Sequence, residues 1–180
     1  ALEAWHAGDN QILDLSVAYT LRPGTGWLVG PGILHAPGSL CTYEPQWGSD
    51  VFGMYQNLVE GRAVSRDLLV KDVPRDRHGD LDFLVDLLDW DANVDPCFFE
   101  NHHLRPVPVA DSMNDGWVDR WVVYGNVGAE QLFTARELTV QPGVSTTLIA
   151  PRPSTILAVQ GVGRANRLPL RSPSMIGFHE

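Results

Sequence analysis

The sequence predicts an all-β protein, and three observations lead to that prediction. Short apolar runs alternate with turn signals along most of the chain, most clearly over 21–46 and 117–178. The 17 glycines and 13 prolines supply the residues that punctuate short strands. A hydrophobic fraction of 44% describes a folded chain rather than a disordered one. Brief strands between tight turns are typical of antiparallel sheets.

Size, charge and cysteine content narrow the functional classes. A chain of 180 residues could hold one large or two small domains. A formal net charge of −9 argues against nucleic-acid and anionic-membrane partners, and leaves small neutral or metal-bridged anionic ligands. Cys41 and Cys97 belong to no Cys-x-x-Cys pair, so two buried thiols in a reducing compartment are expected. Without a span of about 20 apolar residues or a signal segment, we expect a cytoplasmic protein.

The segment 21–46 carries the strongest chemical signal. A Pro23-Gly24 turn precedes the short apolar run 27–29, and the turn residues 30–32 stop that run at once. His35 follows, and a Pro-Gly pair at 37–38 closes the segment. A histidine held between rigid turns at the mouth of a small barrel suits a metal ligand, because its ring is oriented before any ion arrives.

The residues after His35 offer further candidates. Thr42, Glu44 and Gln46 share one parity, so a strand would point all three side chains to the same side. Facing a barrel interior, Glu44 could ligate a metal or act as a general base, and Gln46 could orient a substrate hydroxyl. Facing water, the three would form an exposed polar edge. Pro45 places such a strand at an edge or bends it.

The remaining chain adds helices and more strands. Residues 1–7 have helical spacing, and 17–21 and 51–59 have strand patterns. Apolar residues recur at helical spacing from Leu81 to Leu88, and Asp80 suits the positive end of that helix, with the other aspartates on a solvated face. Adjacent His102 and His103 point to opposite sides of an extended chain, so a loop or interface contact is expected rather than one shared ion.

Segment 21–46 resembles the second conserved motif of the cupin superfamily. Gly24 matches its opening glycine, Gly32 its inner glycine and His35 its metal-binding histidine. The stretch from Trp117 to Phe178 is similar to the opening half of a cupin barrel. At its expected ligand positions stand Ala150 and Ser154, where metal-binding cupins have His and Glu. The resemblance therefore implies a double-stranded β-helix (jelly roll) fold.

The same resemblance implies a domain organisation. Residues 1–72 would be a cupin-like region carrying the histidine motif, 73–105 a helical linker, and 106–180 a second cupin-like region without metal ligands. These would be half or whole barrels. The chain is similar to two-cupin proteins grouped with sugar isomerases of the phosphomannose type, which implies a longer parent. The halves would otherwise pair with each other, with a second copy in a homodimer, or with a complementing chain.

Two functional hypotheses follow. In the first, a metal-dependent cupin isomerises a sugar or sugar phosphate; His35 and Glu44 hold a divalent ion such as Zn, Mn, Fe or Ni, and Glu44 and Gln46 serve catalysis. In the second, a non-catalytic carbohydrate-binding or structural cupin stacks Trp27, Trp47 and Tyr43 on a sugar face, with His35 as a hydrogen-bonding residue.

Overall fold

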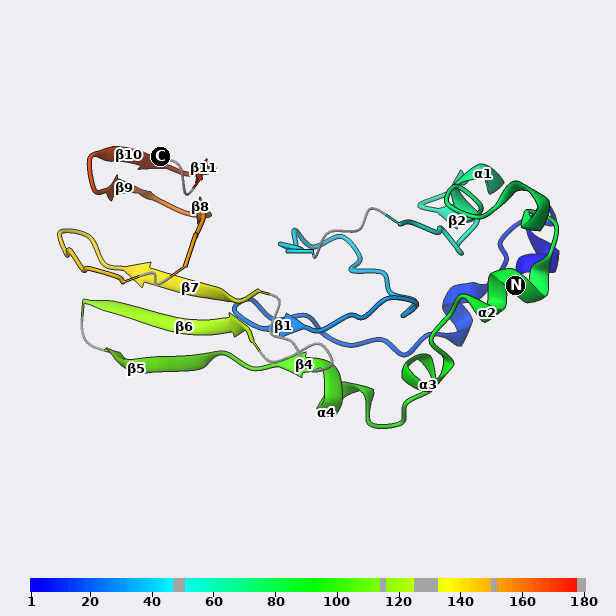
Figure 1. Ribbon diagram of the computed structural model, residues 1–180, viewed down its shortest axis with the longest axis horizontal. Helices are drawn as coiled ribbons and strands as arrows, with labels where there is room; N and C mark the ends of the chain where they lie inside the picture. The colour runs from blue at the N-terminus through cyan, green and yellow to red at the C-terminus, as the bar shows by residue number, and fades with distance from the viewer. Residues whose placement is uncertain (47–50, 114–115, 125–132, 150–151, 178–180) are drawn as a thin grey trace. The chain divides into compact units, whose positions relative to one another are not determined.

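A computed structural model describes residues 1–46, 51–113, 116–124, 133–149 and 152–177 (Figure 1). The chain divides into two compact units, Ala1–Thr139 and Val140–Glu180. Strands dominate the described regular structure, as the sequence predicts, and they form small antiparallel ladders; within the described ranges no sheet exceeds three strands and none closes into a barrel. The predicted boundaries near residues 72 and 105 stay predictions.

The elements are as follows. The strands are β1 (Gly26–Trp27), β2 (Leu58–Val59), β3 (Arg62–Ala63), β4 (His103–Leu104), β5 (Val107–Met113), β6 (Trp117–Val123), β7 (Ala135–Val140), β8 (Ile156–Ala158), β9 (Val162–Ala165), β10 (Leu168–Arg171) and β11 (Ser174–Ile176). The α-helices are α1 (Arg66–Leu69), α2 (Leu81–Asp86), α3 (Trp90–Asn93) and α4 (Phe98–His102). Three 3₁₀ helices cover Leu2–Ala4, Ile12–Leu15 and Arg75–Arg77.

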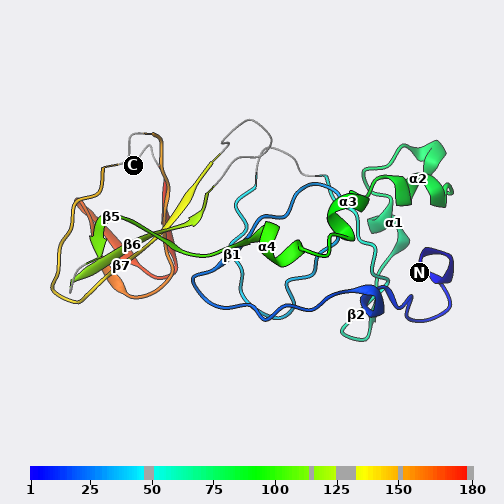
Figure 2. The same ribbon diagram turned by 90° about the horizontal axis from the view of Figure 1, so that it is seen from below.

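The largest sheet has the order β5-β6-β7, and these strands lie side by side in Figures 1 and 2. β5 and β6 are antiparallel, with Val107 opposite Trp121 and a register shift further along β5. The sequence predicted strands from Trp117 onward, where short apolar runs alternate with turn signals, and that prediction is confirmed for 117–123 and 135–140. Gly26 of β1 lies against this sheet, since a Cβ there would be 2.7 Å from the Val122 carbonyl oxygen.

A small hydrophobic core forms around the helix predicted from Leu81 onward. Leu84 of α2 is 0% exposed and packs with Trp5, Leu69 and Val70. The side chain of Asp80 caps α2 by accepting a hydrogen bond from the Phe83 backbone N–H at 3.0 Å. The 3.6-residue apolar spacing therefore identified both the start of this helix and its buried face.

Buried polar groups beside this core are paired. Asn57, 4% exposed, accepts a hydrogen bond from the Asn10 backbone N–H at 2.8 Å and donates to the carbonyls of Trp5 (2.7 Å) and Gly8. Asn10 donates in turn to the Tyr55 carbonyl at 2.8 Å. These bonds join the N-terminal segment to residues some fifty positions later, and they satisfy the amide groups that burial would otherwise leave unpaired.

The unit Val140–Glu180 consists of two antiparallel ladders. β9 and β10 form a hairpin with Ala165 opposite Leu168, and β8 pairs with β11. The strand-turn-strand pattern predicted for this part of the sequence is confirmed. None of the residues described in this unit is buried, and Val162 is 81% exposed.

Some local predictions were wrong. Residues 17–21 form no strand, and in the 51–59 run only β2 is extended and paired, because alternation alone does not supply a neighbouring strand. β2 turns into β3 through Glu60 and Gly61, both at positive φ (49° and 75°), as a two-residue hairpin requires. The N-terminal helix is a single 3₁₀ turn. Cys41 and Cys97 are exposed, not buried, because both lie in surface loop positions.

Candidate functional site

The loop that carries His35 is fastened to α3. Asn93 donates from Nδ2 to the Gly32 carbonyl at 2.7 Å and accepts from the Leu34 backbone N–H at 2.9 Å, so one amide holds both sides of Ile33. The Asp89 backbone N–H also donates to the Gly32 carbonyl, at 3.1 Å. Gly32 has φ +76°, and a Cβ there would lie 2.7 Å from the Asp89 nitrogen. Only glycine fits this close approach without a shift.

The imidazole of His35 has a defined tautomer in its neutral form. Its Nδ1 lies 2.9 Å from the Ile33 carbonyl oxygen. Because that oxygen can only accept, Nδ1 carries the hydrogen and Nε2 keeps the lone pair. Metal-binding histidines commonly donate one ring N–H to a carbonyl in this way. The side chain is exposed.

The other predicted site residues lie in an extended loop. The described residues 41–46 form no strand, and Glu44 and Gln46 are both exposed. Thr42 donates its hydroxyl to Glu44 Oε1 at 3.3 Å. Among the residues that the structure describes, no three His, Cys, Asp or Glu side chains gather to hold a metal ion. His35 therefore supplies one oriented donor, which is fewer than the three or four that a metal centre needs.

The second motif region and the predicted sugar-stacking residues are placed as follows. Ser154 is exposed and donates to the Arg152 carbonyl at 2.9 Å, whereas Ala150 lies outside the described residues. Trp47 also lies outside them, and Tyr43 is 66% exposed. Trp27 is half-buried in β1, where it takes part in a larger group of rings.

An aromatic cluster forms where β1 pairs with β4. Trp27 lies opposite His103 in this antiparallel ladder, with ring centroids 5.0 Å apart. Phe99 stacks on His103 at 4.5 Å, and Phe98 stacks on His102 at 4.2 Å. Tyr19 completes the group, 5.0 Å from Trp27. We call these six rings the aromatic cluster: Tyr19, Trp27, Phe98, Phe99, His102 and His103.

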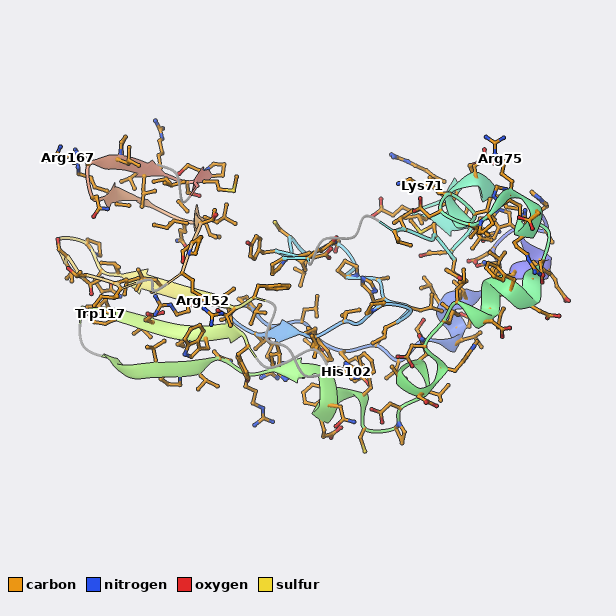
Figure 3. The ribbon with its side chains drawn as sticks, viewed as in Figure 1. Lys71, Arg75, His102, Trp117, Arg152 and Arg167 are labelled. Carbon is orange, nitrogen blue, oxygen red and sulfur yellow. The ribbon has the colours of Figure 1, made fainter. Side chains whose placement is uncertain are left out.

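The adjacent histidine rings stack on different residues, His102 on Phe98 and His103 on Phe99. His102 lies at the end of α4, where the chain enters β4 (Figure 3). Its Nδ1 is 2.8 Å from the Leu28 carbonyl oxygen, and the Leu28 backbone N–H donates back to the His102 carbonyl at 2.8 Å. These bonds extend the β1–β4 pairing, so His102 has a structural role. His103 has no comparable bond among the described residues, and its ring borders a hollow.

The hollow has a volume of about 320 Å³ and opens to solvent. It is lined by Phe99, Glu100, His103, Arg105 and Tyr124. The Tyr124 hydroxyl donates to the Arg105 carbonyl at 2.7 Å. This bond joins the residue after β4 to the residue after β6. The hollow thus combines aromatic rings with one acidic and one basic side chain, a composition suited to a small polar ligand.

Two buried polar atoms of the aromatic cluster have no hydrogen-bond partner among the described residues. They are Nε1 of Trp27 and Nδ1 of His103. An unpaired buried polar group costs about 1–3 kcal/mol, and native proteins contain few of them. Neither atom therefore contributes to the stability of the fold in the way that the Asn57 amide does.

A buried carboxyl on β6 was not foreseen from the sequence. Asp119 is 1% exposed and lies 3.1 Å from the Arg136 guanidinium on β7. Burial raises the pKa of Asp119, and the Arg136 charge opposes that rise. The guanidinium also lies over the Trp121 ring, 5.4 Å from its centroid. This pair links two neighbouring strands, and its sequence signal was a lone aspartate inside the apolar run 117–123.

Comparisons with known proteins add no family. No protein-family model, curated protein or solved structure matches the chain. In the described part of the chain, no helix combines the length and the hydropathy needed to cross a membrane.

Proposed function

We propose that this protein is a cupin-like carbohydrate-binding protein, and that its sugar or sugar-phosphate ligand binds in the hollow beside the aromatic cluster. One observation carries the proposal. The stacked rings of Phe99 and His103 line the same hollow as Glu100 and Arg105. Sugars present C–H groups to aromatic rings and hydroxyl groups to charged planar side chains, so they use both kinds of surface at once.

The sequence motif and the hollow are neighbours in the fold. Trp27, which the sequence singled out as a sugar-stacking residue, lies opposite His103 in the β1–β4 ladder. The Gly26 position next to it allows no side chain, because a Cβ would meet the Val122 carbonyl at 2.7 Å. The glycine-rich motif thus brings β1 close to β6 and presents Trp27 to the ring of His103. This contact supports a role for the motif in building a binding site.

Replacing the aromatic face tests the proposal. We expect Phe99→Leu to weaken binding of D-mannose, D-glucose or their 6-phosphates about two- to tenfold in calorimetric titrations, because the apolar volume remains while the ring is lost. Phe83→Leu is the matched control, since Phe83 is also half-buried but belongs to α2 and lies beneath the Arg77 guanidinium. The proposal fails if wild type binds none of these ligands, or if both variants bind as wild type does.

A second candidate is the metal-dependent sugar isomerase that the cupin resemblance implies. The observation in its favour is the Nδ1 contact of His35 with the Ile33 carbonyl, which leaves Nε2 as a possible ligand. The described residues supply no complete ligand set, so we assign no reaction step to Glu44 or Gln46. Pairing of the barrel halves with a second copy or a complementing chain stays a prediction.

Metal content separates the two candidates. Elemental analysis of the purified protein for Mn, Fe, Ni and Zn would compare wild type with His35→Ala. His6→Ala is the control, because His6 is likewise exposed but lies far from the motif in the sequence. Loss of bound metal in His35→Ala alone supports the isomerase candidate. Equal metal content in all three proteins removes it, and leaves carbohydrate binding as the function.

A further inference from the structure

We infer that the ligand of the hollow is a neutral monosaccharide rather than its phosphate ester, an inference that rests on the carbohydrate-binding function proposed above. The charge and the hydrogen-bonding capacity of the described lining residues favour a small polyol over an anion, and the volume of the hollow favours a single sugar ring.

The charges of the lining residues that the structure describes balance. Glu100 brings one negative charge and Arg105 one positive charge to the same hollow. A phosphate group carries about −1.5 to −2 charges at neutral pH. It would gain an ion pair with Arg105 but would enter beside the Glu100 carboxylate, and like charges at short range oppose binding. A neutral polyol avoids that repulsion.

The described lining residues offer both hydrogen-bond acceptors and a donor, and a hydroxyl group can pair with either kind. A carboxylate only accepts, and a guanidinium only donates. The Tyr124 hydroxyl already donates its proton to the Arg105 carbonyl at 2.7 Å, so its oxygen is left as an acceptor. A sugar hydroxyl both donates and accepts, and vicinal hydroxyls can therefore pair with Glu100, Arg105 and Tyr124 together. A phosphate group carries at most one proton at neutral pH, so its three oxygens offer fewer donors to Glu100 and Tyr124 than vicinal hydroxyls do.

The volume limits the ligand to a single ring. The hollow measures about 320 Å³, at the lower end of the roughly 300–1,000 Å³ typical of ligand pockets. Phe99 supplies the apolar wall against which one face of a pyranose can pack. An oligosaccharide or a dinucleotide would extend beyond these five residues.

Paired titrations test this inference on the full chain. Calorimetry would measure D-mannose against D-mannose 6-phosphate, and D-glucose against D-glucose 6-phosphate. We expect the neutral sugar of each pair to bind at least about tenfold more tightly. Glu100→Gln keeps the shape of the side chain and removes its charge. We expect it to weaken neutral-sugar binding about tenfold and to strengthen binding of the phosphate.

The control is Glu3→Gln, an exposed acid on the first 3₁₀ helix, which leaves both affinities as in wild type. Circular dichroism melts verify that both variants fold as wild type does. Tighter binding of the phosphates than of the parent sugars overturns the inference but leaves the carbohydrate function standing. Unchanged neutral-sugar affinity in Glu100→Gln also overturns it. Absence of binding by every sugar and sugar phosphate overturns both.

Discussion

Two regions of the Ala1–Thr139 unit differ in how they treat buried polar groups. Beside the Leu84 core, the Asn57 amide is paired on both its oxygen and its nitrogen. In the aromatic cluster, Trp27 Nε1 and His103 Nδ1 are buried and have no partner among the described residues. In the first region the buried amide is hydrogen-bonded, as buried polar groups in stable protein interiors usually are. The second retains polar atoms that do not stabilise the fold.

We assign the stability of the fold mainly to the Leu84 core and ligand binding to the aromatic cluster. A ligand site requires partly exposed rings and accessible polar groups, such as the exposed side chains of Glu100 and Arg105, and such sites cost stability. The core around α2 has completely buried aliphatic side chains, whereas the rings of the cluster remain half-exposed or exposed. We therefore expect substitutions in the core to act mainly on the free energy of unfolding, and substitutions in the cluster to act mainly on ligand affinity.

Leu84→Ala is expected to have the largest effect on stability. Leu84 is 0% exposed, so truncation should leave a cavity and lower the free energy of unfolding by about 2–5 kcal/mol. Urea denaturation followed by tryptophan fluorescence measures the loss. Leu87→Ala is the control, because Leu87 is 49% exposed at the end of the same helix, and it should change stability by less than about 0.5 kcal/mol. Equal losses in the two variants would mean that α2 does not bury its predicted face.

Asn57→Leu should come next, with a loss of about 1–3 kcal/mol in the same assay. The substitution keeps the branched shape and the number of side-chain heavy atoms but leaves the Asn10 N–H and the Trp5 carbonyl without their partner. Asn101→Leu serves as control, since the Asn101 side chain is exposed and, among the described residues, bonds only to the nearby Asp95. An Asn57→Leu protein as stable as wild type would remove the contrast between the two regions.

His103→Phe should have the smallest effect. It replaces a ring whose Nδ1 has no partner in the described structure with an apolar ring of similar size, and stacking on Phe99 can persist. We expect a change within about 0.5 kcal/mol, or a slight gain in stability, together with weaker sugar binding. A loss above about 1 kcal/mol would show instead that His103 makes a stabilising hydrogen bond.

Much of the local structure could be predicted from the sequence, because local rules decide it. The spacing of Leu81 and Leu84 and the position of Asp80 identified α2 and its cap. Short apolar runs from Trp117 onward predicted strands there, and β6 and β7 confirm them. The strand expected at 17–21 was wrong because a strand also needs a partner, which sequence alternation cannot supply.

The hollow could not be predicted in full, because Tyr124 joins the described lining residues within 99–105 only through the fold. The stacked pairs Phe98–His102 and Phe99–His103 follow from the four-residue spacing around α4, which was a usable signal. Their meeting with Trp27 follows only from the pairing of β1 with β4. The sequence therefore drew attention to Trp27 and His35, but neither is among the described residues that line the hollow, and Trp27 only contacts His103, which does.

The most direct test is nuclear magnetic resonance of the histidine rings while D-mannose is added to the wild-type protein. His103 should shift its ring ¹⁵N and ¹H resonances with a saturating dependence on sugar concentration, because its ring lines the hollow. His78 should not respond, because it is half-buried and its Nε2 is bonded to the Val73 carbonyl at 2.9 Å. Unchanged His103 resonances at saturating sugar, or equal shifts of both histidines, would contradict a binding site at the aromatic cluster.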